Sequence, residues 1–136
     1  MRIVLDTNVL VSGLLSPYGP PGELVRMAAA GRLILCHDAR ILAEYREVLA
    51  RPKFGFDREH VDAVLVQIHA AGEAVAAGPL PRRLPDPDDE PFLEVALAAG
   101  AACLVTGNLR HFPAAARSGM RVVSPAWCVE RIRRER

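Results

Sequence analysis

The chain has 136 residues, of which 51% are hydrophobic and 24% charged, with a formal net charge of +1. This is the profile of an ordinary soluble globular domain. No apolar run approaches the roughly 20 residues that a membrane span needs, and the apolar stretch at the N-terminus is too short for a secretory signal. We therefore expect one domain over residues 1–136, located in the cytoplasm and without membrane contact.

The cysteine and arginine content adds two weaker expectations. Cys36, Cys103 and Cys128 show no CxxC or Cys/His zinc spacing, so they are expected to be reduced, structural thiols. Sixteen of the seventeen basic residues are arginine, whose planar fork suits phosphate recognition. A GC-rich genome would explain the same bias equally well.

Short apolar segments alternate with amphipathic ones along the chain. IVLD (3–6) predicts a buried strand, and the residues that follow it predict a helix over 9–15. Pro21 near the start and Gly31 just past the end frame a second helix. The remaining expected elements are strand 32–37, helix 38–50 with Asp38 as its N-cap, turn 51–56, helix 57–73, proline-rich loop 78–91, helix 91–100 closed by Gly100, strands 102–107 and 121–124, and helix 125–135.

Strands that alternate with helices predict right-handed crossovers and a parallel sheet covered on both faces. The expected fold class is therefore α/β, a three-layer α/β/α sandwich around a mainly parallel sheet of four to five strands. In such sheets the binding crevice lies outside the carboxyl ends of the strands. Asp6 and the segment TGNLRHF (106–112) both fall at that edge.

Two acidic residues of the first half of the chain are candidates for this crevice. Asp6 closes the first strand, where it could be a site residue or simply the cap of the next helix. Glu44 lies about 90° from the centre of the apolar face of its helix, at the rim, where it could reach over the core edge. Its plainer interpretation is a surface glutamate or an ion pair with Arg40.

The second half of the chain offers an acidic cluster and an asparagine. Asp89 precedes Phe92 and Leu93 by helical spacing and is expected to project from the buried face, whereas Asp88 is the better cap candidate. Asn108 follows the LVTG strand, either as a site residue or as a loop asparagine in a turn. Three carboxylates brought together are unfavourable without a cation, and oxygen ligands suit Mg²⁺ or Mn²⁺ rather than zinc. This is a set of residues suited to nuclease chemistry.

Three segments together resemble a PIN-domain ribonuclease: LDTNVLVSGLL, ILAEYREVLARPKF and DPDDEPFLEVALAAGAACLVTGNLRHF. They cover most of the chain in the right order. The chain most resembles the VapC-like group, the toxin components of type II toxin–antitoxin systems. This resemblance implies a PIN-like fold and metal-dependent hydrolysis of RNA phosphodiester bonds by an Mg²⁺- or Mn²⁺-dependent endoribonuclease.

Carried over from that resemblance, the family's acidic positions fall on Asp6, Glu44 and Asp89, which would hold the metal. Asp86 is the alternative for the third position. The fourth position, often aspartate, is Asn108 here, which removes one negative charge from the expected catalytic set of Asp6, Glu44, Asp89 and Asn108. Thr7 and Ser12 could hydrogen-bond the ligands.

Partners are also implied by the resemblance: an RNA substrate, a cognate antitoxin protein and a second copy in a homodimer. The candidates for contact with the RNA backbone are Arg82, Arg83, Arg110, Arg117 and Arg121, although at least half are expected to be ordinary surface residues. The basic tail RIRRER (131–136) could contact RNA or simply end a helix.

Three other interpretations remain. A catalytically weak or inactive PIN domain could bind RNA as a regulatory module, with Asn108 as the mark of lost activity. A phosphatase using Asp6 as nucleophile would need an acid two residues later, where Asn8 stands. A dinucleotide-binding module would need GxGxxG in the first turn, which is absent.

Overall fold

The computed structural model describes residues 1–135 and contains, within that range, one sheet of five parallel strands in the order β3-β2-β1-β4-β5. The strands are β1 (Arg2–Leu5), β2 (Ile34–His37), β3 (Glu73–Ala74), β4 (Cys103–Val105) and β5 (Val122–Val123). The α-helices of this range are α1 (Thr7–Leu15), α2 (Pro20–Ala29), α3 (Ala39–Leu49), α4 (Arg58–Ala71), α5 (Glu90–Ala99) and α6 (Pro125–Arg134). The predicted α/β class with a parallel sheet is confirmed. Arg136, the last residue of the basic tail, lies outside the described residues.

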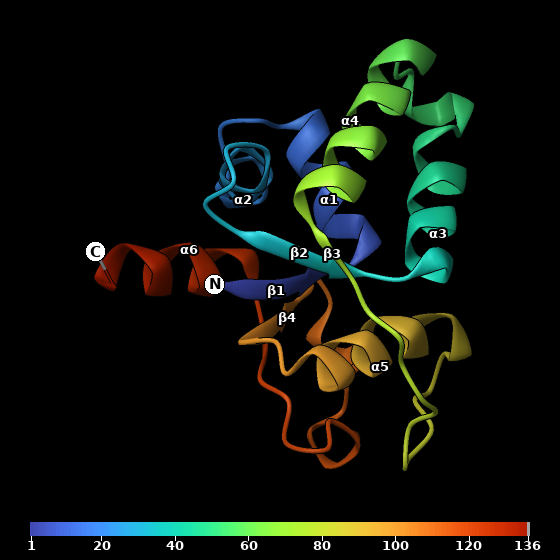
Figure 1. Cartoon of the computed structure of the whole chain (residues 1–136), viewed down its shortest axis with the longest axis vertical. Coiled ribbons are helices and arrows are strands. Elements are labelled where there is room, and N and C mark those ends of the chain that lie inside the picture. The colour runs from blue at the N-terminus through green and yellow to red at the C-terminus, as the bar shows by residue number, and fades with distance from the viewer. Residues whose placement is uncertain (136) are drawn as a thin grey trace.

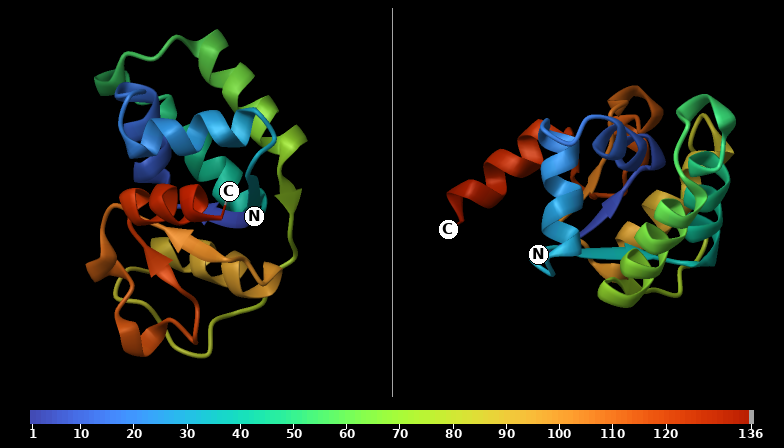
Figure 2. Two further views of the ribbon diagram at one scale, coloured as in Figure 1. Left: turned by 90° about the vertical axis from the view of Figure 1, so that its left-hand side faces the viewer. Right: turned by 90° about the horizontal axis from the view of Figure 1, so that it is seen from above.

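The sheet separates two layers of helices. Helices α1 to α4 lie on one face and α5 on the other, while α6 packs against α2 at the end of the sheet where β1 begins (Figure 1). Figure 2 shows this arrangement from two further directions. Because both faces are covered, the central strand β1 is almost entirely apolar, and Ile3, Val4 and Leu5 are fully buried. No helix within residues 1–135 is long and apolar enough to cross a membrane.

Of the two helix caps predicted from the sequence, one is confirmed and the other is wrong. Asp38 caps α3 as predicted, since its Oδ1 accepts a hydrogen bond from the Ile41 N–H at 3.0 Å. The prediction that Asp88 is the cap before α5 is wrong. A short 3₁₀ turn (Pro87–Asp89) precedes α5, and its cap is Asp86, which accepts from the Asp88 N–H at 2.9 Å. Two prolines in this region move the cap upstream.

The edge strand β3 is not predicted from the sequence, which indicated helix through Glu73. Helix α4 ends at Ala71, because Gly72 has extended backbone with φ −91° and ψ −168°. A Cβ at Gly72 would lie 2.7 Å from the Ile68 carbonyl oxygen, so the chain must leave the helix here without a side chain. Glu73 then pairs with Cys36 in the sheet, and its carboxylate lies 2.7 Å from Arg2 Nε. This long-range pairing overrides the helical pattern.

His37, the last residue of β2, is a buried group whose two ring nitrogens have no hydrogen-bond partner among the described residues. Burial lowers the pKa of His37, and the ring of His69 at 5.7 Å adds to this effect. A lowered pKa means that the unfolded chain takes up a proton that the folded chain excludes. The contribution of His37 to stability is therefore present above the unfolded pKa of about 6.5 and falls as the pH drops below it.

We expect a His37→Leu variant to lose less stability than the wild type between about pH 6.5 and pH 5. Leucine has a similar volume and needs no hydrogen-bond partner, so the proton-linked destabilisation disappears with the imidazole. The measurement is the free energy of unfolding in urea across this pH range. The exposed His60, changed to Gln, serves as control. Identical pH slopes for the wild type and the His37 variant would contradict the prediction.

Candidate functional site

Asp6 stands at the junction of β1 and α1, and it serves both of the roles that the sequence left open. Its Oδ1 accepts from the Thr7 N–H at 2.8 Å and so caps α1, while its Oδ2 accepts from the Thr106 hydroxyl at 2.8 Å. The side chain is only 5% exposed. Burial raises the pKa of Asp6, although both hydrogen bonds oppose this rise. The carboxylate is thus fixed in place at the carboxyl end of the central strand.

Glu44 reaches the same edge from α3. It is half-buried, as expected for the rim of that helix, and its Oε2 accepts from the Thr7 hydroxyl. The alternative of an ion pair with Arg40 is wrong, because Arg40 is bound to other carboxylates. Burial raises the pKa of Glu44, and the nearby charge of Asp6 raises it further. Thr7 therefore links the first and second acidic residues.

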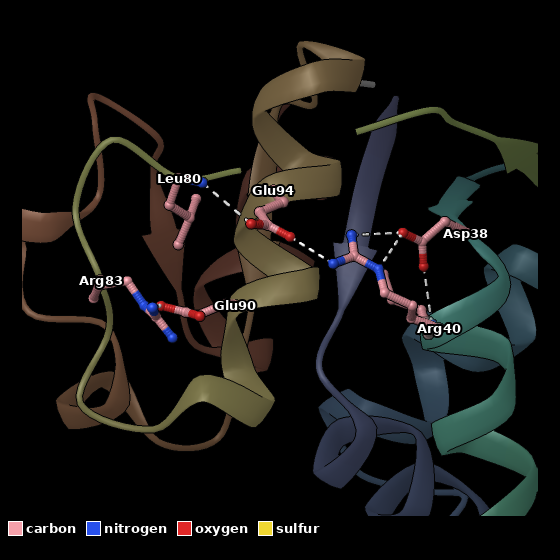
Figure 3. Close-up of polar contacts among 7 residues, drawn as sticks. Asp38, Arg40, Leu80, Arg83, Glu90 and Glu94 are labelled. Atoms are coloured by element: carbon pink, nitrogen blue, oxygen red, sulfur yellow. Dashed lines mark hydrogen bonds and ion pairs between the residues drawn. The ribbon is translucent and has the colours of Figure 1, made fainter. Parts of the chain in front are cut away.

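An ion-pair network joins α3 and α5 through Arg40 (Figure 3). Arg40 lies 2.7 Å from Asp38 at the start of α3 and 2.6 Å from Glu94 on α5. Glu94 also accepts from the Leu80 N–H at 3.1 Å, which anchors the proline-rich loop. Glu90, one turn before Glu94 in α5, accepts a hydrogen bond from the Leu84 N–H of the same loop. The network sets the relative position of the helices that carry Glu44 and Asp89.

Asp89 is the third carboxylate, and it is buried whereas the alternative candidate Asp86 is exposed. Burial raises the pKa of Asp89 to about 6, and the charges of Asp6 and Glu44 add to the shift. Three carboxylates from β1, α3 and the start of α5 therefore act on one another electrostatically. Such a group is unfavourable when all members are charged and no cation is near.

Asn108 lies beside this group but contacts none of its carboxylates directly. Its side-chain nitrogen is 2.8 Å from His111 Nε2, and its backbone N–H donates to the Thr106 hydroxyl at 3.1 Å. His111 Nδ1 in turn lies 3.0 Å from Asp89 Oδ2. When Asn108 donates to Nε2, a neutral imidazole carries its proton on Nδ1, the nitrogen nearest Asp89. Asn108 thus reaches the carboxylates through His111.

Two residues of the site, Thr106 and His111, are not predicted from the sequence. Leu5 is paired with Val105 between β1 and β4, so the next residues, Asp6 and Thr106, are neighbours across the sheet. A parallel pairing of the IVLD and LVTG strands would have indicated Thr106. His111 follows Asn108 by three residues in a 3₁₀ turn (Leu109–His111), a spacing that places the two side chains on one side.

Of the other residues that the sequence suggested for the site, some lie near the carboxylates and others do not. Thr7 contacts the site, whereas Ser12 is exposed on α1. Arg110 is exposed on the loop that carries Asn108 and His111. Arg121 precedes β5, at the opposite end of the sheet from Asp6. The other three are engaged elsewhere: Arg83 with Glu90, Arg82 with the Ala115 carbonyl, and Arg117 with the Phe112 carbonyl.

The donor set can be compared with what a divalent cation requires. As arranged here, no group of three or more His, Cys, Asp or Glu side chains within residues 1–135 could hold a metal ion directly. One buried oxygen is nevertheless unsatisfied: Asp89 Oδ2 makes no hydrogen bond of acceptable geometry despite its proximity to His111. Carboxylate oxygens are the ligands that Mg²⁺ and Mn²⁺ prefer, and Mg²⁺ commonly keeps several waters. The oxygen chemistry of the three carboxylates is of the kind that a hard divalent cation prefers.

The order of the strands reverses between β1 and β4, which makes this the topological switch point of the sheet. The protein is therefore an α/β protein with an acidic site at that point. A family model described as "PIN domain" matches residues 2–110, and the chain belongs to this family. PIN domains are generally nucleases, so the fold is of nuclease type. A comparison with curated proteins finds no match. The matched range includes all four candidate positions, whereas β5 and α6 follow it.

Proposed function

We propose that this PIN domain is a metal-dependent endoribonuclease in which Asp6, Glu44 and Asp89 hold Mg²⁺ or Mn²⁺. The observation that carries the proposal is the convergence of these three carboxylates, from three separate parts of the chain, at one edge of the sheet. There Asp6 raises the pKa of Glu44, and both raise the pKa of Asp89. Family membership supports nuclease chemistry, and the donor set supports a hard dication.

When bound, a divalent cation lowers the pKa of water and offsets negative charge on a phosphodiester. The side chains of this protein would prepare the site for it. The Thr106 and Thr7 hydroxyls donate to Asp6 and Glu44, which leaves these carboxylates little freedom to rotate. Asp89 Oδ2 is buried and makes no hydrogen bond within the described residues. Fixed carboxylates of this kind need no reorganisation when charge develops during the reaction.

Asn108 would support this arrangement through His111. His111 Nδ1 lies 3.0 Å from Asp89 Oδ2, and a positive charge on His111 lowers the pKa of Asp89, which opposes the effect of burial. An aspartate at position 108 would add a further negative charge to an already crowded group. We infer that asparagine here orients His111 and does not replace a ligand.

The test is cleavage of a pool of structured RNAs by the full chain with Mg²⁺, with Mn²⁺ and with EDTA. We expect cleavage with either metal, none with EDTA, and a loss of about tenfold or more in Glu44→Gln. Glu47→Gln is the matched control, because Glu47 is on the same helix, exposed and paired with Arg51. RNA that is bound but never cut would favour the alternative, a PIN domain acting as an RNA-binding module.

We further propose that the chain is the toxin of a toxin–antitoxin pair and that it forms a homodimer. An apolar cavity of about 210 Å³ between α2, α4 and β2, lined by Val25, Val64 and Ile68 among others, would accept an apolar side chain of a protein partner. Expression of the wild type should arrest growth of a bacterial host, and expression of a site variant should not. Light scattering of the purified chain would give its oligomeric state.

A further inference from the structure

A second group of reactive side chains lies at the other end of the sheet from Asp6. Cys103 begins β4 and Cys128 lies on α6, and both thiols are buried, with 2% and 1% of their surface exposed. The two thiols interact with each other, and this interaction is the largest influence on the pKa of each. Both residues also line one cavity, so their side chains lie side by side although β4 and α6 are far apart in the sequence.

The pair lines a small cavity of about 130 Å³ that is also bordered by Arg121, Trp127 and Arg131. Arg121 and Trp127 are exposed, so the cavity opens at the molecular surface, next to α6. The guanidinium of Arg121 lies over the Trp127 ring at 5.3 Å, and that of Arg131 at 5.9 Å. A water molecule occupies about 30 Å³ in the liquid, so a solute of two or three heavy atoms fits beside the thiols.

The two cysteines differ in their ability to ionise. The interaction with Cys128 lowers the pKa of Cys103, burial opposes this change, and the positive charge of Arg121 lowers the pKa further. The same interaction raises the pKa of Cys128, which keeps its proton, and burial adds to this rise. The thiolate is the reactive form of cysteine. Arg121 is the neighbour of Cys103 across the β4–β5 pairing, since Leu104 N–H donates to the Arg121 carbonyl at 2.9 Å. This position beside a guanidinium assigns Cys103 as the nucleophile of the pair, with Cys128 on the same cavity to react with it afterwards.

We propose that Cys103 and Cys128 are a peroxide-oxidation site that closes to an intramolecular disulfide between β4 and α6. The Cys103 thiolate attacks one oxygen of hydrogen peroxide, the O–O bond breaks, and the departing hydroxide takes a proton to become water. Cys103 becomes a sulfenic acid and the peroxide is reduced. Cys128 sulfur then attacks Cys103 sulfur: the S–S bond forms, the S–O bond breaks, and the hydroxide leaves as water with the Cys128 proton. Overall, two thiols and one peroxide give one disulfide and two waters.

The disulfide would join residues 103 and 128 and close the segment that carries Thr106, Asn108 and His111. Closing a loop of this length restricts the unfolded chain, so the oxidised protein should have a higher Tm than the reduced one. The proposal does not depend on the nuclease function, because both cysteines lie away from the carboxylates.

The experiment uses the reduced full chain, exposed to hydrogen peroxide, alkylated in denaturant and examined by intact mass and peptide mapping. The wild type should lose two of its three alkylatable thiols and yield one cross-linked peptide pair that contains Cys103 and Cys128. Cys36→Ser is the matched control and should behave like the wild type. Cys36 is also buried and also near an arginine, Arg2, but it does not line the cavity.

Two further variants separate the roles of the pair. Cys128→Ser should accumulate a sulfenic acid that dimedone traps on Cys103, whereas Cys103→Ser should react about tenfold more slowly or not at all. A wild type that keeps three alkylatable thiols, a cross-link that contains Cys36, or dimedone on Cys128 would each overturn the proposal. The wild-type peptide map decides even if a cysteine variant fails to fold.

Discussion

Asp6→Asn is expected to reduce RNA cleavage by about 100-fold or more while leaving the fold intact. The asparagine oxygen can still accept from the Thr7 N–H, and its amide can donate to the Thr106 hydroxyl, which rotates to accept. What disappears is the negative charge at the centre of the acidic group. Cleavage assays in Mg²⁺ and Mn²⁺, beside a thermal melt, measure both effects.

The prediction also covers the thermal stability of the Asp6→Asn variant. Because burial raises the pKa of Asp6, the charged carboxylate is disfavoured in the folded protein, so its removal should not lower Tm at neutral pH. Asp57→Asn is the control for activity, since Asp57 is exposed at the start of α4 and makes no capping hydrogen bond. If Asp6→Asn folds and cleaves normally, Asp6 is a helix cap and nothing more.

Gly22→Ala should destabilise the protein by about 3 kcal/mol, which corresponds to a fall in Tm of about 10 °C. Gly22 lies in the first turn of α2, packed against the backbone of Pro17 in the α1–α2 connection. A Cβ there would clash with the Pro17 carbonyl oxygen and lie 2.6 Å from Pro17 Cα. These are backbone atoms, so no side chain can move to make room. Urea denaturation gives the change in the free energy of unfolding.

Gly78→Ala is the matched control for this effect. A Cβ at Gly78 would meet nothing within 4 Å, and its φ is not in the left-handed region. We expect the free energy of unfolding to stay constant or to rise by up to about 1 kcal/mol, because alanine restricts the unfolded chain. Equal losses of stability in both variants would show that the close approach of Gly22 to the Pro17 backbone is not the cause.

Most of the fold could be predicted because apolar segments and their periodicity are local properties. The IVLD and CLV strands, the cap at Asp38 and the glycine that closes α5 are all readable from a few neighbouring residues. Strand β3 could not be predicted, because it is two residues long and depends on pairing with β2 and on the ion pair between Arg2 and Glu73. No local pattern contains that information.

Some residues of the candidate site could likewise be predicted from the sequence, and others could not. The positions of Asp6, Glu44 and Asp89 followed from strand ends and helix faces, and the structure places all three at one edge, although their roles stay predictions. The contributions of Thr106 and His111 depend on which strands are neighbours and on side-chain tautomers, which a single sequence does not specify. Asn108 shows the limit best. Its position was predicted, but its contact with His111 was not.

The hydrogen bond between Thr106 and Asp6 joins residues 100 positions apart. During synthesis the chain is released from its N-terminus, so Asp6 and the helix it caps emerge long before β4 exists. Pairing of β1 with β4 is a long-range contact, and such contacts form late in folding. Until Thr106 has been made, Asp6 lacks the hydroxyl that fixes its second carboxylate oxygen, so the acidic group reaches its final arrangement only after β4 has paired with β1.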